Sequence, residues 1–316
     1  GLNTGSPYYI AVTTYDTDGN ESWYSAEAQA TPIADTLNVP VSYTTIQSAL
    51  SAASEGDVVF VQPGTYTENI IWPETNGIKL ISAGDSSNTI IDGGGTSSVI
   101  YMNPQTATID TTTLIQGFKI TNGGSVNSGG GMVIISASPI IESTKFLNNQ
   151  AISEGGTLYI TNSSLHLKNV LIESSSLTGG SNPKGGGIYI SSSNPEIINL
   201  IIQNLSLSGS VKGGGIYSLD TSIENVKIAN ITGTDDGGGI YLYAPSTYNS
   251  AYIKNCTFSS TDTYGLGHAI YLTPTSMDIY NCTFSNYSQA LALWDNECIV
   301  YRGKIKKCLF FDNNQF

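Results

Sequence analysis

An internal repeat of about 27 residues runs through most of the sequence, and a repeat of this length restricts the chain to a few architectures. Each copy contains a segment that reads apolar-x-Asn-apolar-x-apolar, and the Asn positions of five successive copies are 30, 26, 30 and 26 residues apart. They are Asn169, Asn199, Asn225, Asn255 and Asn281. Weaker copies at Gln116, Ser143 and Lys307 extend the series in both directions.

A second motif alternates with the first and reads Gly-Gly-x-apolar-Tyr-apolar. Its copies place tyrosines 30, 28, 24 and 30 residues apart, at Tyr159, Tyr189, Tyr217, Tyr241 and Tyr271. Neither motif has helical periodicity, so each repeat consists of short strands joined by tight turns. Strands at this period predict a right-handed parallel β-helix, because leucine-rich repeats need a leucine framework and propeller blades need about 40 residues.

In a β-helix, equivalent residues of successive rungs stack in columns about 4.8 Å apart. Two inward apolar columns are evident: Ile188, Ile216, Ile240 and Ile270, and Val170, Leu200, Val226, Cys256 and Cys282. Asn tolerates the left-handed conformation of a tight turn, and stacked amides can hydrogen-bond along the column. The Gly-Gly pairs suit a second turn in which a Cβ atom would clash.

The cysteines follow the same spacing. Cys256, Cys282 and Cys308 are 26 residues apart and fall in one inward column, whereas Cys298 lies outside it. A metal or redox site would be the functional interpretation. We expect a stack of small buried hydrophobic side chains, which needs no partner.

The N-terminal part of the chain differs from the repeats. Residues 44–53 place Ile46, Ala49, Leu50 and Ala53 at helical spacing behind threonine caps, which predicts a helix that closes the N-terminal end of the solenoid. Residues 8–15 alternate like a strand, and a turn follows at residues 16–20. We therefore expect two units, residues 1–32 and 33–316.

Two runs within residues 43–70, Glu55-Gly56-Asp57-Val58-Val59-Phe60-Val61 and Pro63-Gly64-Thr65-Tyr66, resemble the start of the β-helix in the pectin-lyase-like superfamily. The later repeats resemble those of bacterial surface β-helices, including polymorphic outer-membrane proteins and adhesins, most closely in Phe146-Leu147-Asn148-Asn149 and Phe284-Ser285-Asn286. The resemblance implies a secreted or cell-surface protein. It does not select an activity, because the superfamily holds lyases, hydrolases, esterases, epimerases and non-catalytic adhesins.

Residues 8–32, ending in Ala30-Thr31-Pro32, resemble the last two strands of a fibronectin type III domain. A whole domain of that kind would be several times longer, so we expect the chain to be cut from a longer modular protein. Residues 1–32 are therefore interpreted as a partial fibronectin type III-like segment.

Composition excludes several partners. Lys and Arg number 12 against 25 Asp and Glu, and the net charge of −13 argues against nucleic acid and anionic membrane surfaces. No apolar run reaches about 18 residues, so we expect no membrane insertion, and no signal peptide remains.

In saccharide-active members of the superfamily, substrate lies along the first sheet, which the Gly-Gly-x-Ile-Tyr strands resemble. The outward column of this sheet contains Tyr159, Tyr189, Tyr217, Tyr241 and Tyr271. Exposed tyrosines would offer flat apolar faces with polar rims to a glycan or to a protein partner. The alternative is that the aromatic rings only stabilise the parallel sheet.

A column of charged residues lies five positions before each tyrosine and includes Glu154, Lys184, Lys212 and Asp236. Such groups beside a groove could transfer protons, or they could form a salt-bridged ladder on a solvated turn.

Asp235-Asp236 and Gly267-His268 invite comparison with polygalacturonases, in which two carboxylates act as acid and base. The Asn-Thr-Asp motif is missing, Ala269 follows His268, and Arg302-Gly303-Lys304 is a poor third match. Pectate-lyase chemistry would need a Ca²⁺ cluster and a basic residue, but the only arginine is Arg302. We expect no metal or other cofactor, since Ca²⁺ at Asp235 and Asp236 would need more oxygen ligands than two carboxylates provide.

The sequence thus predicts a secreted bacterial surface module that binds extracellular glycan or a surface protein through the tyrosine-lined sheet and has no catalytic site. The first alternative is a polysaccharide lyase or glycoside hydrolase that uses Lys184, Lys212, Asp235, Asp236 or His268. The second is a structural stalk or filament subunit.

Overall fold

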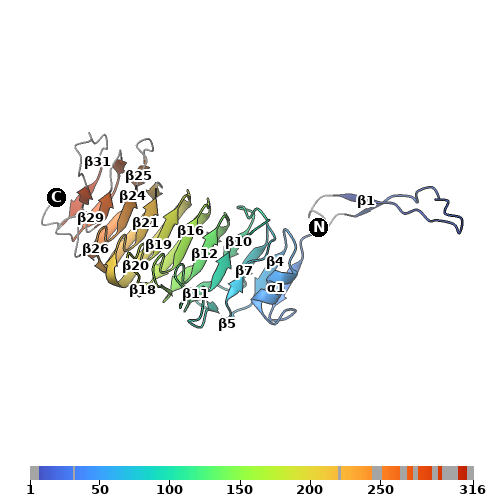
Figure 1. Cartoon of the computed structure of the whole chain (residues 1–316), viewed down its shortest axis with the longest axis horizontal. Helices are drawn as coiled ribbons and strands as arrows, with labels where there is room; N and C mark the ends of the chain where they lie inside the picture. Colours follow the sequence, from blue (N-terminus) through green and yellow to red (C-terminus); the bar gives the residue numbers. More distant parts are fainter. Residues whose placement is uncertain are drawn as a thin grey trace.

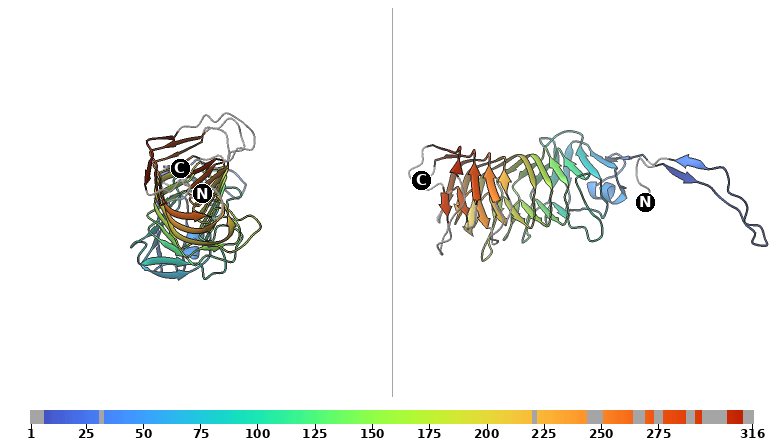
Figure 2. Two further views of the ribbon diagram at one scale, coloured as in Figure 1. Left: turned by 90° about the vertical axis from the view of Figure 1, so that its left-hand side faces the viewer. Right: turned by 90° about the horizontal axis from the view of Figure 1, so that it is seen from above.

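The computed structural model describes residues 7–30, 33–219, 222–243, 251–263, 269–272, 277–286, 291–293 and 305–311. They form an elongated solenoid of parallel strands, with a thin hairpin extending from its N-terminal end (Figure 1). Figure 2 shows the stacked rungs from above and from one end. This architecture confirms the prediction of an all-β parallel β-helix.

Two large parallel sheets are formed by the described residues. The nine-stranded sheet contains β6 (Ile70–Ile71), β9 (Ile100–Met102), β12 (Met132–Ile135), β16 (Leu158–Thr161), β19 (Ile188–Ser191), β21 (Ile216–Leu219), β24 (Ile240–Tyr243), β27 (Ile270–Leu272) and β30 (Leu291–Leu293). The fifteen-stranded sheet contains β3 (Thr36–Val39), β4 (Val58–Val61), β5 (Gly64–Thr67), β7 (Lys79–Ser82), β8 (Thr89–Asp92), β10 (Leu114–Gln116), β11 (Lys119–Thr121), β13 (Ile140–Glu142), β14 (Lys145–Leu147), β17 (His166–Glu173), β20 (Glu196–Val211), β23 (Val226–Thr234), β26 (Thr257–Thr263), β29 (Thr283–Ser285) and β32 (Leu309–Phe311).

Two smaller parallel sheets complete the rungs. One contains β22 (Ile223–Glu224), β25 (Ala251–Lys254), β28 (Met277–Tyr280) and β31 (Ile305–Lys306), and the other pairs β15 (Gln150–Ala151) with β18 (Ser176–Leu177).

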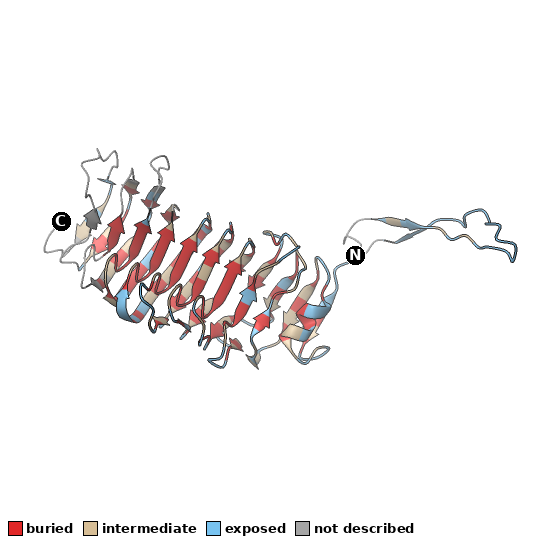
Figure 3. Cartoon of the chain, viewed as in Figure 1, coloured by how far each residue is buried: buried red, intermediate tan, exposed pale blue. Residues whose placement is uncertain are grey.

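The inward columns form as predicted. Ile188, Ile216, Ile240 and Ile270 are aligned on successive strands and are fully buried. Each such isoleucine stabilises the fold by about 1.5–3 kcal/mol through removal from water. Cys256 and Cys282 are buried in their column and Cys308 is half-buried, all three as free thiols. The interior thus appears as a continuous band of buried strands in Figure 3.

The asparagine turns also form as predicted. The five repeat asparagines have φ between 50° and 61°, in the left-handed region. The Nδ2 group of Asn281 donates to Oδ1 of Asn255 at 2.9 Å, and that of Asn255 donates to Oδ1 of Asn225 at 3.2 Å. This amide ladder satisfies the turn side chains along the solenoid axis.

Glycine is required at the turn before the nine-stranded sheet. Gly185 and Gly213 have φ of 66° and 67°. A Cβ atom would lie 2.2 Å from the Ile188 carbonyl oxygen at the first position and 2.3 Å from that of Ile216 at the second. The expected clash is therefore confirmed.

Helix α1 (Ile46–Ala52) covers the N-terminal end of the solenoid, inside the predicted range of 44–53. Its N-cap residue Thr45 accepts a hydrogen bond from the Ser48 backbone at 3.0 Å, and Glu68 accepts from the backbone N–H groups of Ile46 and Gln47, both at 2.9 Å. A carboxylate there satisfies two unpaired donors and complements the helix dipole. No helix in the described part of the chain is long and apolar enough to cross a membrane.

Strands β1 (Tyr8–Ile10) and β2 (Ala28–Ala30) form an antiparallel hairpin. The Asp16 carboxylate closes its turn by accepting from the backbone N–H groups of Asp18 and Asn20. Trp23 is 96% exposed, and nearly all of the hairpin is exposed (Figure 3). The expected strand and turn are present, and the relation to a fibronectin type III domain stays a prediction.

Ser218 interrupts an inward apolar column. It pairs with Ile190 and Leu242 and is fully buried, and its hydroxyl has no hydrogen-bond partner among the residues that the structure describes. An unsatisfied buried hydroxyl costs about 1–3 kcal/mol.

We expect Ser218→Val to raise the free energy of unfolding by about 1–2 kcal/mol in urea titrations, because it removes this cost and adds apolar burial. Thr161→Val, which points outward from the same sheet, is the control, and a less stable Ser218→Val variant would contradict the argument.

Glu74 holds a loop through backbone hydrogen bonds. Its carboxylate accepts from the N–H groups of Gln105 at 2.7 Å and of Thr106 and Ala107 at 3.0 Å. These bonds favour the ionised form and lower the pKa of Glu74 to about 2.

Because this pKa is depressed, the carboxylate stabilises the loop fully above its ordinary pKa of 4.5, and the contribution is lost as pH falls toward 2. The amide NMR signals of Gln105, Thr106 and Ala107 should titrate with a midpoint near 2. The titration should disappear in Glu74→Gln. A wild-type midpoint near 4.5 would show that the three bonds do not form.

Candidate functional site

Five tyrosines of the nine-stranded sheet stack into a continuous column, here called the tyrosine ladder: Tyr159, Tyr189, Tyr217, Tyr241 and Tyr271. Successive ring centroids are 5.1, 5.5, 5.1 and 4.8 Å apart, and the interplanar angles are 7°, 2°, 12° and 16°. The strand register imposes this stack, because parallel strands place identical positions one strand spacing apart.

The ladder faces outward, as the alternation predicts, and forms a hydrophobic cluster separate from the solenoid core. The expected exposure is wrong, however. Tyr189, Tyr217, Tyr241 and Tyr271 are 7, 6, 5 and 1% exposed. Because rings one rung apart are at stacking distance, each covers its neighbours' faces. The ladder therefore cannot offer flat ring faces along its length.

Two lysines extend over the ladder. The Lys184 Nζ atom lies 5.3 Å from the ring centroid of Tyr217, and the Lys212 Nζ atom lies 5.4 Å from that of Tyr241. Each lysine reaches the ring one rung further along the axis. The geometry is that of a cation–π contact, which stabilises both groups and fixes the ammonium beside the ladder.

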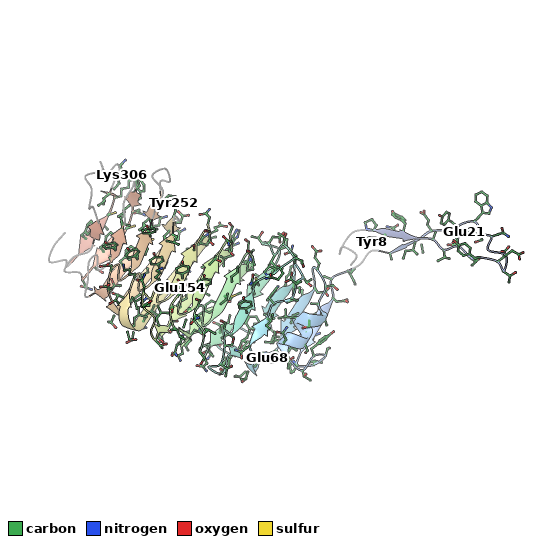
Figure 4. All side chains as sticks on the ribbon, viewed as in Figure 1. Tyr8, Glu21, Glu68, Glu154, Tyr252 and Lys306 are labelled. Carbon is green, nitrogen blue, oxygen red and sulfur yellow. The ribbon has the colours of Figure 1, made fainter. Side chains whose placement is uncertain are left out.

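The charged column predicted five residues before the tyrosines is confirmed. Glu154, Lys184 and Lys212 are joined by parallel backbone bridges on successive rungs. The Gly213 N–H donates to the carbonyl of Asp236 at 3.0 Å, as the Gly185 N–H donates to that of Lys212 at 2.9 Å, so Asp236 continues the column. Glu154 lies midway along the solenoid in Figure 4.

A second outward column lies two residues after the tyrosines and was not singled out from the sequence. Thr161 pairs with Ser191, and Leu219 pairs with Tyr243. Thr161 and Ser191 are small, polar and half-buried, whereas Leu219 packs against the ladder. The sequence signal that could have identified this column is the two-residue alternation of each strand, which places the second residue after each tyrosine on the same outward face. The ladder, its charged column and these small polar residues are together called the tyrosine face.

Burial raises the pKa of Tyr217 and Tyr241 well above the ordinary value of 10, and neighbouring phenol groups raise it further. Burial also raises the pKa of Tyr159 and Tyr189, with a contribution from the Glu154 carboxylate. These four phenol groups therefore stay protonated at neutral pH, and a phenol hydroxyl can both donate and accept hydrogen bonds.

The remaining candidates are only partly brought together. Asp235 is half-buried, and its N–H donates to Val211, next to the charged column. His268, like Arg302, lies outside the residues that the structure describes. Within the described ranges, no group of three or more His, Cys, Asp and Glu side chains is arranged to hold a metal ion.

No protein-family model matches the sequence, and no curated protein matches it. Among solved structures, the chain is similar to pectin methylesterase from carrot, with 14% identity over 87% of this chain and 82% of that one, and a TM-score of 0.43. Pectin methylesterase PemA from Erwinia chrysanthemi shares 12% identity over 91% and 94%, with a TM-score of 0.44. ORF18 of Geobacillus virus E2 shares 14% over 100% and 72%, with a TM-score of 0.37. The function is therefore argued from this chain's own residues.

The raised pKa values of the ladder predict alkaline destabilisation. Folded Tyr217 keeps its proton to higher pH than the unfolded chain, so this stability is complete below about pH 10 and is lost as pH rises above it. Urea unfolding midpoints should fall between about pH 9 and about pH 11, and Tyr217→Phe should reduce the fall. An equal fall in both proteins would contradict the assigned burial effect.

Proposed function

We propose that the chain is a secreted or cell-surface module that binds an extracellular glycan through the tyrosine face, without catalysis. The observation that carries the proposal is the ladder of five outward phenol groups, held at nearly constant spacing in a direction parallel to the solenoid axis. Such a row places one phenol hydroxyl group on each rung.

An extended polymer with repeating hydroxyl groups is the ligand that matches a row of this kind. Lys184 and Lys212 add donors on one side of the row, and Thr161 and Ser191 add hydroxyl groups on the other. The groups are fixed by stacking and by sheet hydrogen bonds before any ligand arrives. Binding therefore orders few protein side chains, which favours affinity. The mode differs from the sequence-based expectation, since hydroxyl edges replace ring faces.

A second candidate function is a polysaccharide lyase or glycoside hydrolase acting along the same sheet. It is favoured by the placement of Lys184, Lys212 and Asp236 on successive rungs beside the ladder. Both candidates place the ligand along the tyrosine face, so one set of variants separates them.

The test is calorimetric titration of the full chain with neutral and anionic glycans, with and without Ca²⁺. Tyr217→Phe keeps the stacked ring and removes only the hydroxyl. We expect it to weaken binding about fivefold, the equivalent of about 1 kcal/mol for one hydrogen bond, and Tyr217→Phe/Tyr241→Phe to weaken it further. Tyr15→Phe on the hairpin is the control. Unchanged affinity in the double variant would overturn the proposed face.

The same mixtures are assayed for new reducing or unsaturated ends. We expect none. Product formation that disappears in Asp236→Ala or Lys212→Ala would replace the binding module with the enzyme. If no polymer is bound or cleaved, the ligand is a protein instead of a glycan.

A further inference from the structure

A polar hollow of about 550 Å³ lies beside β5, β8, β11 and β14, away from the tyrosine face. Its polar side chains are Thr67, Asp92, Asn122, Asn148 and Gln150. Neither the asparagine motif nor the Gly-Gly-x-apolar-Tyr-apolar motif predicted that these residues lie together.

The strand register explains why they meet. Thr67 is aligned with Asp92, and Asp92 with Thr121, which precedes Asn122. Thr121 is in turn aligned with Leu147, which precedes Asn148. The polar groups thus occupy four successive rungs, a length of about 14 Å at the usual strand spacing.

Part of the lining of the hollow is bare backbone. Gly94 and Gly95 have φ of 60° and 72° and so take up conformations that disfavour other residues. A Cβ atom at Gly95 would meet no atom within 4 Å, so no packing contact fills this space. A ligand can therefore approach the main chain closely.

One carboxylate is fixed in the hollow. Asp92 accepts from the Gly94 N–H through Oδ1 and from the Asn122 Nδ2 group through Oδ2, both at 2.9 Å. Each oxygen keeps accepting capacity for a second donor. Asp92 is only half-buried, so its remaining lone pairs can be reached.

The other side chains are open to a ligand. Within the described part of the chain, the side chains of Thr67, Asn148 and Gln150 form no hydrogen bond or ion pair with the protein. Amides and a hydroxyl both donate and accept hydrogen bonds, and together with one carboxylate they match the adjacent hydroxyl groups of a sugar. The lining contains one charged group and no aromatic ring.

We propose that this hollow is a second glycan-binding site, which takes a short stretch of neutral sugar units through Asp92, Asn148 and Gln150. It shares the ligand class of the proposed function and uses none of the residues of the tyrosine face.

The test is calorimetric titration of the full chain with cellohexaose, mannohexaose and galactohexaose. Asn148→Gly removes the amide and tolerates the left-handed φ of 54°, and Asp92→Asn removes the charge at constant shape. Asn230→Gly is the matched control, because Asn230 also has φ of 54° but lies outside the hollow. We expect Asn148→Gly and Asp92→Asn each to weaken binding of at least one hexasaccharide tenfold or more, with Asn230→Gly unchanged.

The titrations are repeated in Tyr217→Phe/Tyr241→Phe. If the hollow binds sugar and the tyrosine face does not, this variant binds as wild type while Asp92→Asn is weakened. If only the tyrosine face binds, the pattern is reversed and the hollow is overturned. Ca²⁺ binding that Asp92→Asn abolishes, with no loss of hexasaccharide affinity, would also overturn the proposal by assigning the hollow to a cation.

Discussion

Backbone hydrogen bonding between successive rungs fixes the distance between equivalent residues, and the rest of the structure depends on that distance. Parallel strands lie about 4.8 Å apart, which is close to the spacing at which flat side chains stack. The tyrosine ladder, the rings of Phe258, Phe284 and Phe310 at 5.1 and 4.9 Å, and the asparagine amides all use this coincidence. Planar side chains can therefore repeat on successive rungs without strain.

Much of this could be predicted from the sequence, because the turn residues carry strong backbone requirements. The spacing of Asn225, Asn255 and Asn281 gave the rungs, and the glycine pairs gave the second turn. Alternation within each strand then assigned Ile216 inward and Tyr217 outward. Burial of the tyrosines could not be predicted in this way, because alternation indicates which face a residue occupies and not what lies one rung above it. For the same reason the sequence did not show that Lys184 reaches the ring of Tyr217.

The hollow at Asp92 was missed for a different reason. The first rungs carry weak copies of the motifs, so Thr67, Asp92 and Asn148 could be aligned only once the pairing of β5, β8, β11 and β14 was known. The run Gly93-Gly94-Gly95 was the available signal, since consecutive glycines outside the repeat motif indicate bare backbone. The hairpin of residues 7–30 is a third case. The alternating strand pattern and the turn residues predicted the conformation of the hairpin. They do not indicate which surface, if any, the hairpin contacts.

The rigidity of the tyrosine ladder has a consequence for selectivity. The spacing of its hydroxyl groups is set by the main chain of the solenoid, so it cannot adjust to a ligand. A polymer whose own repeat differs slightly from the rung spacing would match the first phenol groups and then drift out of phase with the later ones. The ladder would thus distinguish polymers by the length of their repeat more than by the identity of their units.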